Sequence, residues 1–231
     1  LEQFPARLRP ALLPPAGRIV SFHDFRGTPA RLERIYRRLA RLGADRVKIA
    51  VTARSQADNL AVLDLARRHP GRVLALGAGS ALAYAAPERG PATAPGQIPW
   101  SEFRDSYRAQ RLNARTRVYG VIGRPIAHSL SPAMHNAAFR AARLNAVYLP
   151  FEVASLRDFL DCLGPLGVAG FSVTLPHKKA VLRYLDGIDP LAEQIGAVNT
   201  VVVRGGGRLY GYNTDYVGIL RALQGAIRLH A

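Results

Sequence analysis

Hydrophobic residues in the N-terminal half of the chain occur either as short continuous runs or at intervals of three to four positions. The continuous runs at residues 18–24, 45–53 and 72–78 predict strands, because strands buried on both faces carry almost only apolar residues. The periodic stretches at 28–44 and 55–71 predict helices between them. Strand–helix alternation of this kind is typical of a parallel sheet covered by helices.

Polar residues mark where several of these elements begin. Thr28 is the expected N-cap of the first helix, with Pro29 in its first turn, and Ser55 is the expected N-cap of the second. Further along, the apolar run at 80–86 predicts another strand, and a helix is expected at 101–112.

The C-terminal half repeats the alternation without repeating the sequence. Strands are expected at 117–123, 145–153 and 168–174, with helices between them. Glycines at 205–207 lie between two apolar runs and predict a hairpin, and a helix is expected at 216–227. We expect an α/β fold throughout, in which residues 1–112 form one unit, the polar segment 113–117 is a linker, and 118–231 form a second unit.

Length, hydropathy and cysteine content indicate which classes of protein the chain can belong to. The chain has 231 residues, enough for one large domain or two small ones. No apolar run approaches the roughly 18 residues that a membrane span requires, and the N-terminus does not resemble a signal peptide, so we expect a cytoplasmic protein with no membrane partner. Cys162 is the single cysteine, which excludes an internal disulfide and a cysteine-built metal site, and we expect it to be a buried thiol.

The charge is strongly basic. Lys and Arg total 32 against 16 Asp and Glu, a formal net charge of +16, which suits an anionic partner such as nucleic acid. The arginines are spread along the whole chain, however, and the densest set recurs every three or four residues in the helix expected at 28–44, as a solvated helix face would. No zinc-finger, RNP or homeodomain pattern is present. We expect no nucleic-acid partner, with RNA binding as an alternative.

Lysine is rare in this arginine-rich chain, with only Lys48, Lys178 and Lys179. A buried lysine loses its proton more readily than an arginine and can then act as a nucleophile or base. Lys48 lies within an expected strand, and His23 lies at the carboxyl end of the neighbouring one. A neutral amine can form an imine with a ketone, and a nearby imidazole can remove the adjacent proton. A structural role for this histidine is the alternative.

The motifs "SFHDF", "GADRVKIAVTA" and "ATAPGQI" together resemble the type I 3-dehydroquinate dehydratases, which are (β/α)8 barrels. The resemblance implies that Lys48 forms the imine, that His23 is the general acid/base, and that Thr93 and Gln97 lie in a loop that closes over substrate. It covers the later half of such a barrel, so we expect a partial barrel. A family Ser-Arg segment is missing near Gly77–Ser80.

A second group of residues suggests a site in the C-terminal half. Ser131, the expected N-cap of a helix, and Ser129 before it offer hydroxyls beside a helix N-terminus, a suitable cradle for a carboxylate. Lys178 lies in a first helical turn, where a cation is unfavourable with respect to the helix dipole, and Asp215 is expected at a strand end. A Lys–Asp pair can move a proton to or from an alcohol. Plain helix capping and a surface salt bridge are the alternatives.

The motifs "SLSPAMHN", "GFSVTLPHK", "GAVNT" and "GYNTDYVG" resemble, in this order, the substrate-binding domain of shikimate dehydrogenases, with an α/β sandwich around a mainly parallel sheet. The resemblance implies that Ser129 and Ser131 bind the substrate carboxylate. It implies that Thr174 and Asn199 contact the substrate hydroxyls and that Lys178 and Asp215 are the catalytic pair. Ser172 departs from the family's usual Asn.

The two resemblances belong to consecutive reactions, as in fused dehydratase–dehydrogenases. They imply dehydration of 3-dehydroquinate through a lysine Schiff base and reduction of 3-dehydroshikimate to shikimate, with small-molecule substrates and no metal. The cofactor implied is NADP, bound by a Rossmann domain that we expect to be missing from this chain. The alternative is a non-catalytic module that binds a shikimate-like ligand.

Overall fold

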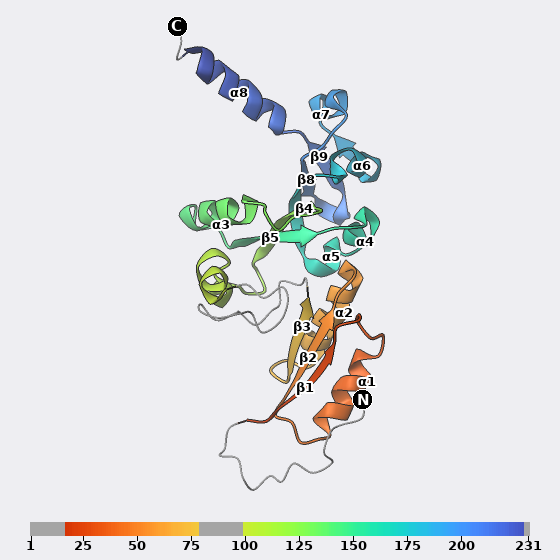
Figure 1. Ribbon diagram of the computed structural model, residues 1–231. Helices are drawn as coiled ribbons and strands as arrows, with labels where there is room; N and C mark the ends of the chain where they lie inside the picture. The colour runs from red at the N-terminus through yellow and green to blue at the C-terminus, as the bar shows by residue number, and fades with distance from the viewer. Residues whose placement is uncertain (1–16, 79–98, 229–231) are drawn as a thin grey trace.

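The computed structural model describes residues 17–78 and 99–228, without the side chains of 75–78 and 227–228. It contains two α/β units joined by a linker (Figure 1). The strand expected at 80–86 and the loop residues Thr93 and Gln97 lie outside the described residues.

The N-terminal unit is a three-stranded parallel sheet with two helices. Its strands lie in the order β1-β2-β3, so each strand is beside its neighbour in sequence. The element bounds are β1 Ile19–Asp24, α1 Leu32–Ala40, β2 Arg46–Thr52, α2 Gln56–Arg68 and β3 Val73–Ala78. The expected strand and helix alternation is confirmed, with three strands of a barrel-like arrangement in the described residues.

Both helices cover the same face of this sheet. Val47, Ile49 and Val51 of β2 point to that face and are buried with Tyr36 of α1 and Leu65 of α2 in one apolar cluster. Because strand residues alternate between faces, the residues between them in β2, including Lys48, point to the opposite face.

Of the two N-caps expected in the N-terminal unit, the one at α2 is confirmed and the one at α1 is not. Ser55 caps α2 as expected, since its hydroxyl accepts a hydrogen bond from Asp58 N–H and the Asp58 carboxylate accepts one from Ser55 N–H. Thr28 was expected to cap α1, but that prediction is wrong. Its hydroxyl donates to the Thr52 carbonyl at 3.2 Å instead, and α1 begins at Leu32, after an N-cap at Arg31 that makes no side-chain cap bond.

The helix expected at 101–112 is not continuous. A π-helical turn at Glu102–Ser106 and a 3-10 turn at Ala109–Arg111 replace it. Between them Arg108 has a φ of 50°, in the left-handed region, which ends the first turn.

The C-terminal unit is built on a six-stranded sheet in the order β5-β4-β6-β8-β9-β7. The two strands that pair with β4, which are β5 and β6, are parallel to it. Strand β8 is antiparallel to both β6 and β9, and β8 and β9 form the expected hairpin around the glycines at 205–207. The strand bounds are β4 Arg117–Gly123, β5 Ala146–Glu152, β6 Val168–Val173, β7 Gly187–Ile188, β8 Thr200–Val203 and β9 Leu209–Tyr212.

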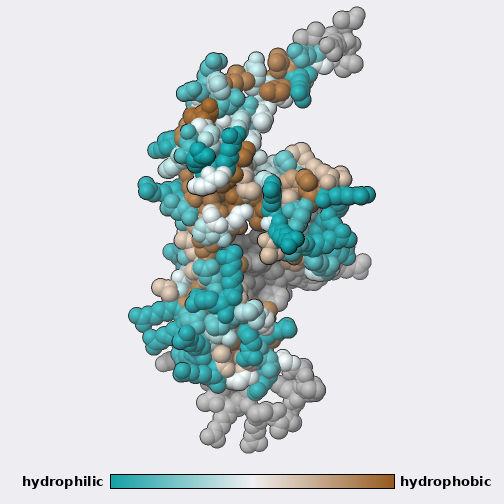
Figure 2. Space-filling model, turned by 180° about the vertical axis from the view of Figure 1, so that it is seen from behind, coloured by the Kyte–Doolittle hydropathy of each residue, from teal (hydrophilic) through white to brown (hydrophobic). Residues whose placement is uncertain are grey.

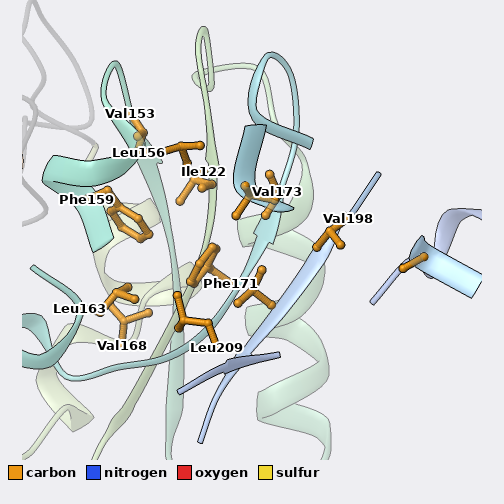
Figure 3. Close-up of a cluster of buried hydrophobic side chains, with 13 residues drawn as sticks. Ile122, Val153, Leu156, Phe159, Leu163, Val168, Phe171, Val173, Val198 and Leu209 are labelled. Carbon is orange, nitrogen blue, oxygen red and sulfur yellow. The ribbon is translucent and has the colours of Figure 1, made fainter. Parts of the chain in front are cut away.

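Helices cover both faces of this sheet and make three layers. Val121 of β4 packs with Tyr148 beneath Phe139 of α3, whereas the next residue, Ile122, packs on the other face with Phe159 of α4 (Figure 3). The helix bounds are α3 Ser131–Ala141, α4 Leu156–Asp161, α5 Leu163–Leu166, α6 His177–Ala180, η4 Val181–Tyr184, α7 Pro190–Ile195, η5 Gly205–Gly207 and α8 Asp215–Arg228. Helix α8 projects away from the sheet (Figure 1).

The two units touch where α2 lies against α4. The carboxylate of Asp158 in α4 accepts hydrogen bonds from the N–H groups of Gln56, at 2.7 Å, and Ala57, at 3.4 Å, in the first turn of α2. Arg67 at the other end of α2 donates to the Pro165 carbonyl at 3.4 Å. An acid from the second unit therefore satisfies free N–H groups of a helix in the first.

Three further observations bear on the function classes. Cys162 is buried, as expected, and burial together with the nearby carboxylates of Asp158 and Asp161 raises the pKa of its thiol. The described helices include none with the length and apolar character of a membrane span. Within the same residues, no group of three or more His, Cys, Asp or Glu side chains is placed to hold a metal ion.

Candidate functional site

A cavity of about 440 Å³ opens at the carboxyl ends of β4 and β6. Crevices at this edge of a parallel sheet are the usual location of ligand sites in α/β folds. The six residues singled out in the C-terminal half all line it: Ser129, Ser131, Thr174, Lys178, Asn199 and Asp215. Four separate sequence motifs therefore meet at one cavity.

The two serines lie at the start of α3, on one wall of the cavity. Ser131 was expected to be the N-cap, but it is the first helical residue, after Leu130. Its N–H donates to the Ser129 hydroxyl at 3.3 Å. The pair still presents two hydroxyls beside a helix N-terminus, where the free N–H groups favour an anion.

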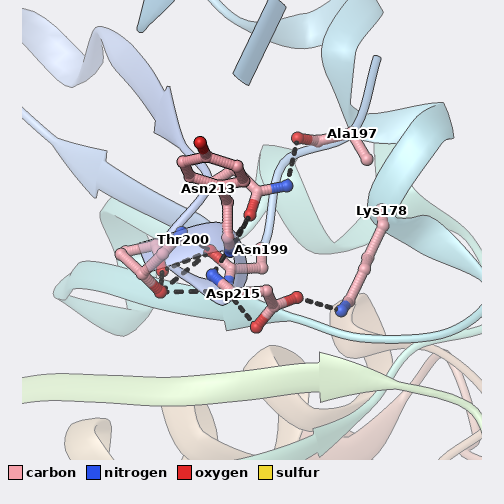
Figure 4. Close-up of polar contacts among 8 residues, drawn as sticks. Lys178, Ala197, Asn199, Thr200, Asn213 and Asp215 are labelled. Atoms are coloured by element: carbon pink, nitrogen blue, oxygen red, sulfur yellow. Dashed lines mark hydrogen bonds and ion pairs between the residues drawn. The ribbon is translucent and has the colours of Figure 1, made fainter. Parts of the chain in front are cut away.

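Lys178 and Asp215 both line the cavity and form an ion pair there (Figure 4). The Lys178 Nζ atom lies 2.6 Å from Asp215 Oδ2, and the two side chains are 32% and 47% exposed. Asp215 was expected at a strand end, but it is the first residue of α8, where a carboxylate is favoured by the helix dipole. An ion pair this accessible can exchange a proton with a bound ligand.

The short helix α6 explains how a lysine is held in a first helical turn. This helix has four residues, so its dipole is small. The Lys178 carbonyl accepts a hydrogen bond from Val198 N–H at 2.9 Å, which fixes the backbone beside the segment that carries Asn199. The next lysine, Lys179, is exposed and does not line the cavity.

Asn199 orients Asp215 from the other side (Figure 4). Its Nδ2 atom donates to Asp215 Oδ1 at 2.6 Å, so each carboxylate oxygen of Asp215 has a partner. Its Oδ1 atom accepts from the Thr214 N–H and the Thr200 hydroxyl, each at 2.9 Å. Because Asn199 is 9% exposed and hydrogen-bonded at both ends of its amide, it is held in one orientation.

The protonation state of Asp215 follows from these contacts. Partial burial raises the pKa of its carboxyl, but hydrogen bonds from Lys178 and Asn199 and the charge of Lys178 outweigh burial and bring the pKa below its usual value of 3.8. Asp215 is therefore a carboxylate at neutral pH.

Two further residues at the cavity, His135 and its stacking partner Tyr148, were not singled out from the sequence. His135 lies in the cavity lining and stacks on Tyr148, with ring centroids 4.2 Å apart. Tyr148 donates its hydroxyl to Ser172 at 2.7 Å. Ser172 was noted only as a departure from a family pattern, and the stacked pair gave no signal because its members come from different elements.

The candidate residues of the N-terminal unit lie on the helix-free face of its sheet. In the register of β1 and β2, Lys48 is beside Ser21 and His23 is two residues further along the same face. From strand geometry, their Cα atoms are roughly 8 Å apart. His23 is exposed, and its ring meets Phe25 edge-on with centroids 5.7 Å apart.

Two family models match the chain, one in each unit. Residues 15–114 match type I 3-dehydroquinase, and residues 121–201 match the shikimate dehydrogenase substrate binding domain. The first match covers all three motifs from which its resemblance was inferred, and the second covers three of four, because the motif at 211–218 with Asp215 lies beyond residue 201. A partial barrel followed by an α/β domain fits both the matches and the fold.

Curated relatives match either nearly the whole chain or about half of it. A bifunctional 3-dehydroquinate dehydratase/shikimate dehydrogenase from Arabidopsis thaliana, named as chloroplastic, is 37% identical over 227 residues, which is 91% of this chain and 38% of that protein. A shikimate dehydrogenase (NADP(+)) from Bacillus mycoides is 57% identical over 110 residues, covering 47% of this chain and 39% of that protein.

A crystal structure of shikimate dehydrogenase from Aquifex aeolicus aligns with a TM-score of 0.49 at 46% identity, over 51% of this chain and 44% of that one. The chain spans well under half of the length of the curated relatives it matches.

Proposed function

We propose that the C-terminal unit binds shikimate and 3-dehydroshikimate in the cavity between α3 and α8. The chain resembles a bifunctional 3-dehydroquinate dehydratase/shikimate dehydrogenase along nearly its whole length. The observation that carries this proposal is the convergence of two hydroxyls, an amide and a Lys–Asp pair from four motifs on one cavity of about 440 Å³. This volume suits a small cyclic acid.

Each wall of the cavity meets a different part of such a ligand. Ser129 and Ser131 receive the carboxylate at the N-terminus of α3, where hydroxyl and N–H donors coincide with the positive end of a helix. Thr174 and Asn199 lie beside the ring hydroxyls. Because the carboxylate and the hydroxyls are held at separate places, the ligand is oriented with one hydroxyl toward Lys178.

The Lys178–Asp215 pair then accepts or donates the proton on the oxygen of the carbon that is oxidised or reduced. When the alcohol is oxidised, its hydroxyl proton passes to the pair; when the ketone is reduced, the pair returns a proton to the same oxygen. Asp215, a carboxylate at neutral pH, keeps the Lys178 amine oriented by their 2.6 Å contact. Asn199 fixes the carboxylate in turn.

NADP supplies or accepts the hydride when it is bound. In the described residues, the turns after β4 and β6 lack the Gly-x-Gly sequence of a dinucleotide-binding turn, so this part of the chain does not fit the cofactor by itself. We propose that the dehydrogenase activity uses NADP, which the name of the Bacillus relative gives for that protein, and that a further domain holds the cofactor.

Calorimetric titration of the 231-residue chain with shikimate tests the proposal. We expect one shikimate per chain and no measurable binding of shikimate methyl ester, which lacks the carboxylate charge. Equal binding of acid and ester would contradict the carboxylate cradle, and no binding of either would overturn the proposed function. Binding without turnover when NADPH and 3-dehydroshikimate are supplied is expected for the chain alone, and is also the behaviour of the alternative ligand-binding module.

A second activity is favoured by the placement of Lys48 and His23 on one face of adjacent parallel strands. We propose that Lys48 forms an imine with 3-dehydroquinate and that His23 moves the proton in the dehydration. The match of residues 15–114 to type I 3-dehydroquinase supports this assignment. Thr93 and Gln97 are proposed to lie in a loop over the substrate.

Borohydride reduction in the presence of 3-dehydroquinate tests the lyase assignment, because it converts an imine to a stable secondary amine. Mass spectrometry is expected to locate the adduct on Lys48, and a Lys48→Arg variant is expected to give none. An adduct confined to Lys178 or Lys179, or no adduct at all, would contradict it.

The expected cytoplasmic location stays a prediction, since the name of the Arabidopsis relative places that protein in the chloroplast.

A further inference from the structure

A second cavity, of about 820 Å³, lies beside the linker between the two units. One wall is formed by residues 104–113, and the other by residues 140–146, at the end of α3 and the start of β5. It shares no lining residue with the cavity that holds Lys178 and Asp215. Its volume lies in the range of small-molecule sites, about 300–1,000 Å³.

The lining of this second cavity is strongly basic. Five arginines and one aspartate line it, a net charge of +4 among these residues: Arg104, Arg108, Arg111, Arg140, Arg143 and Asp105. The single acid is already engaged, because both Asp105 carboxylate oxygens accept from Arg104, each at 2.7 Å. The other four arginines have no carboxylate in the lining to pair with.

The two walls are held together by contacts that leave several of these arginines available. Arg140 donates to the Asp105 carbonyl at 3.2 Å, and Asn145 donates to Asn113 Oδ1 at 3.2 Å. Thr116 adds a hydrogen bond to Asn145 Oδ1 at 2.8 Å. Among the residues that the structure describes, the guanidinium groups of Arg108, Arg111 and Arg143 make no hydrogen bond or ion pair.

Helix electrostatics accounts for only part of this arrangement. The negative end of the α3 dipole favours cations such as Arg140 and Arg143. It does not account for Arg108 and Arg111, which the segment of residues 104–113 brings against them from the other wall. Like charges gathered around one hollow repel one another, and a bound anion would offset that cost.

Hydrophilic side chains also cover much of the outer surface of the lobe that carries α3, seen from behind (Figure 2). We propose that the cavity between residues 104–113 and the end of α3 binds a small organic anion that carries two or more phosphate groups. Guanidinium groups donate two parallel hydrogen bonds to a phosphate, and arginines on both walls let two phosphates be held at once. The amide side chains of Gln110 and Asn113 add neutral polar groups to the lining.

Calorimetric titration of the full chain with sodium pyrophosphate tests this proposal. At about 50 mM salt we expect one pyrophosphate per chain, bound more weakly at about 200 mM salt. The double variant Arg111→Gln/Arg143→Gln removes one available cation from each wall, and we expect it to weaken binding about tenfold or more. Inorganic phosphate is expected to bind more weakly than pyrophosphate, because it can engage only one wall.

A matched control separates a built site from diffuse charge. Arg34→Gln/Arg38→Gln removes the same charge from exposed positions of α1, and we expect pyrophosphate binding to be unchanged. Equal weakening by both double variants, or no pyrophosphate binding by the wild type, would overturn the proposal. The proposal would also be overturned if a single-stranded RNA oligonucleotide bound in a way that depended on Arg111 and Arg143 while pyrophosphate failed to bind. The surface would then be a nucleic-acid site.

Folding is checked by the thermal unfolding of each variant. If the double variant is unfolded, the single variant Arg108→Gln provides the same test with several-fold weakening expected. Trp100 is the single tryptophan of the chain, four positions before Arg104 of the cavity lining, and its fluorescence gives a second readout of binding. An unchanged pyrophosphate affinity in both Arg108→Gln and the double variant would contradict the site.

Discussion

Lys178 and Asp215 are 37 residues apart in the chain, yet their side chains meet at 2.6 Å. Lys178 comes from the short helix after β6, and Asp215 begins α8 after β9. The hairpin of β8 and β9 turns the chain back so that the two elements end at the same cavity. The pair therefore depends on the fold of the whole C-terminal unit.

Replacing Lys178 with Met should raise the pKa of Asp215, because the carboxylate loses its charged partner and one hydrogen bond. In the wild type the pKa is lowered, so the stability contributed by Asp215 is full above the unfolded pKa near 3.8 and is lost as pH falls through the folded pKa. The variant should lose less stability in this acid range. Carbon-13 NMR titration of the carboxyl measures the pKa directly, and an unchanged value in Lys178→Met would contradict the pairing. Lys179→Met is the control.

Replacing Asn199 with Ala should destabilise the C-terminal unit by about 1–3 kcal/mol, because it leaves polar partners without hydrogen bonds. Thr214 N–H and the Thr200 hydroxyl lose their acceptor, and Asp215 loses a donor. Urea unfolding measures the stability change. Asn213→Ala is a useful comparison: the Asn213 side chain donates to the Ala197 carbonyl and accepts from the backbone N–H groups of Asp215 and Tyr216, but it makes no bond to the Asp215 carboxylate. A pKa of Asp215 that rises in Asn213→Ala but not in Asn199→Ala would show that Asn199 does not orient the acid.

His135 should make stability depend on pH. Burial lowers the pKa of its imidazole below the usual 6.5, so the fold favours the neutral ring. The stability it contributes is full above the unfolded pKa and is lost as pH falls through the folded pKa. His135→Phe keeps a ring on Tyr148 but cannot titrate, so its unfolding free energy should fall less than that of the wild type between about pH 7 and pH 5. Identical slopes for the two proteins would exclude this role.

Asp158→Ala should weaken the contact between the two units. The substitution removes the carboxylate that accepts from Gln56 and Ala57 at the start of α2, and loss of such an acceptor costs about 1 kcal/mol. Differential scanning calorimetry should show a lower unfolding temperature for the N-terminal unit. Asp161→Ala, an exposed acid on the same helix, serves as the control. If both substitutions have the same effect, the bond across the two units contributes nothing specific.

The sequence pattern predicts the elements well wherever the deciding contacts are local. Ser55 caps α2 because its partner, Asp58, is three residues away. Thr28 fails as a cap because a distant acceptor, the Thr52 carbonyl, takes its hydroxyl, and no local pattern contains that contact. The expected helix at 101–112 breaks at Arg108 for a similar reason: its neighbours are tied to α3 by the bond from Arg140 to Asp105.

The candidate site shows the same division. Motif resemblance selected Lys178, Asp215 and the serines, and the structure places them around one cavity. It did not select His135, because the stacking of this ring on Tyr148 joins a helix to a strand. The basic cavity beside the linker also escaped the sequence, since arginines spread along a chain give no sign of which ones converge.

NMR titration of the isotope-labelled chain with shikimate tests whether the cavity lined by Ser129, Lys178 and Asp215 receives a shikimate-like acid. We predict that the backbone signals of Ser129, Ser131, Thr174 and Asn199, and the side-chain signals of Lys178 and Asp215, shift together along one binding curve. The signals of Lys48 and His23 should stay in place. Shifts confined to residues outside this cavity, or none at saturating shikimate, would contradict the account.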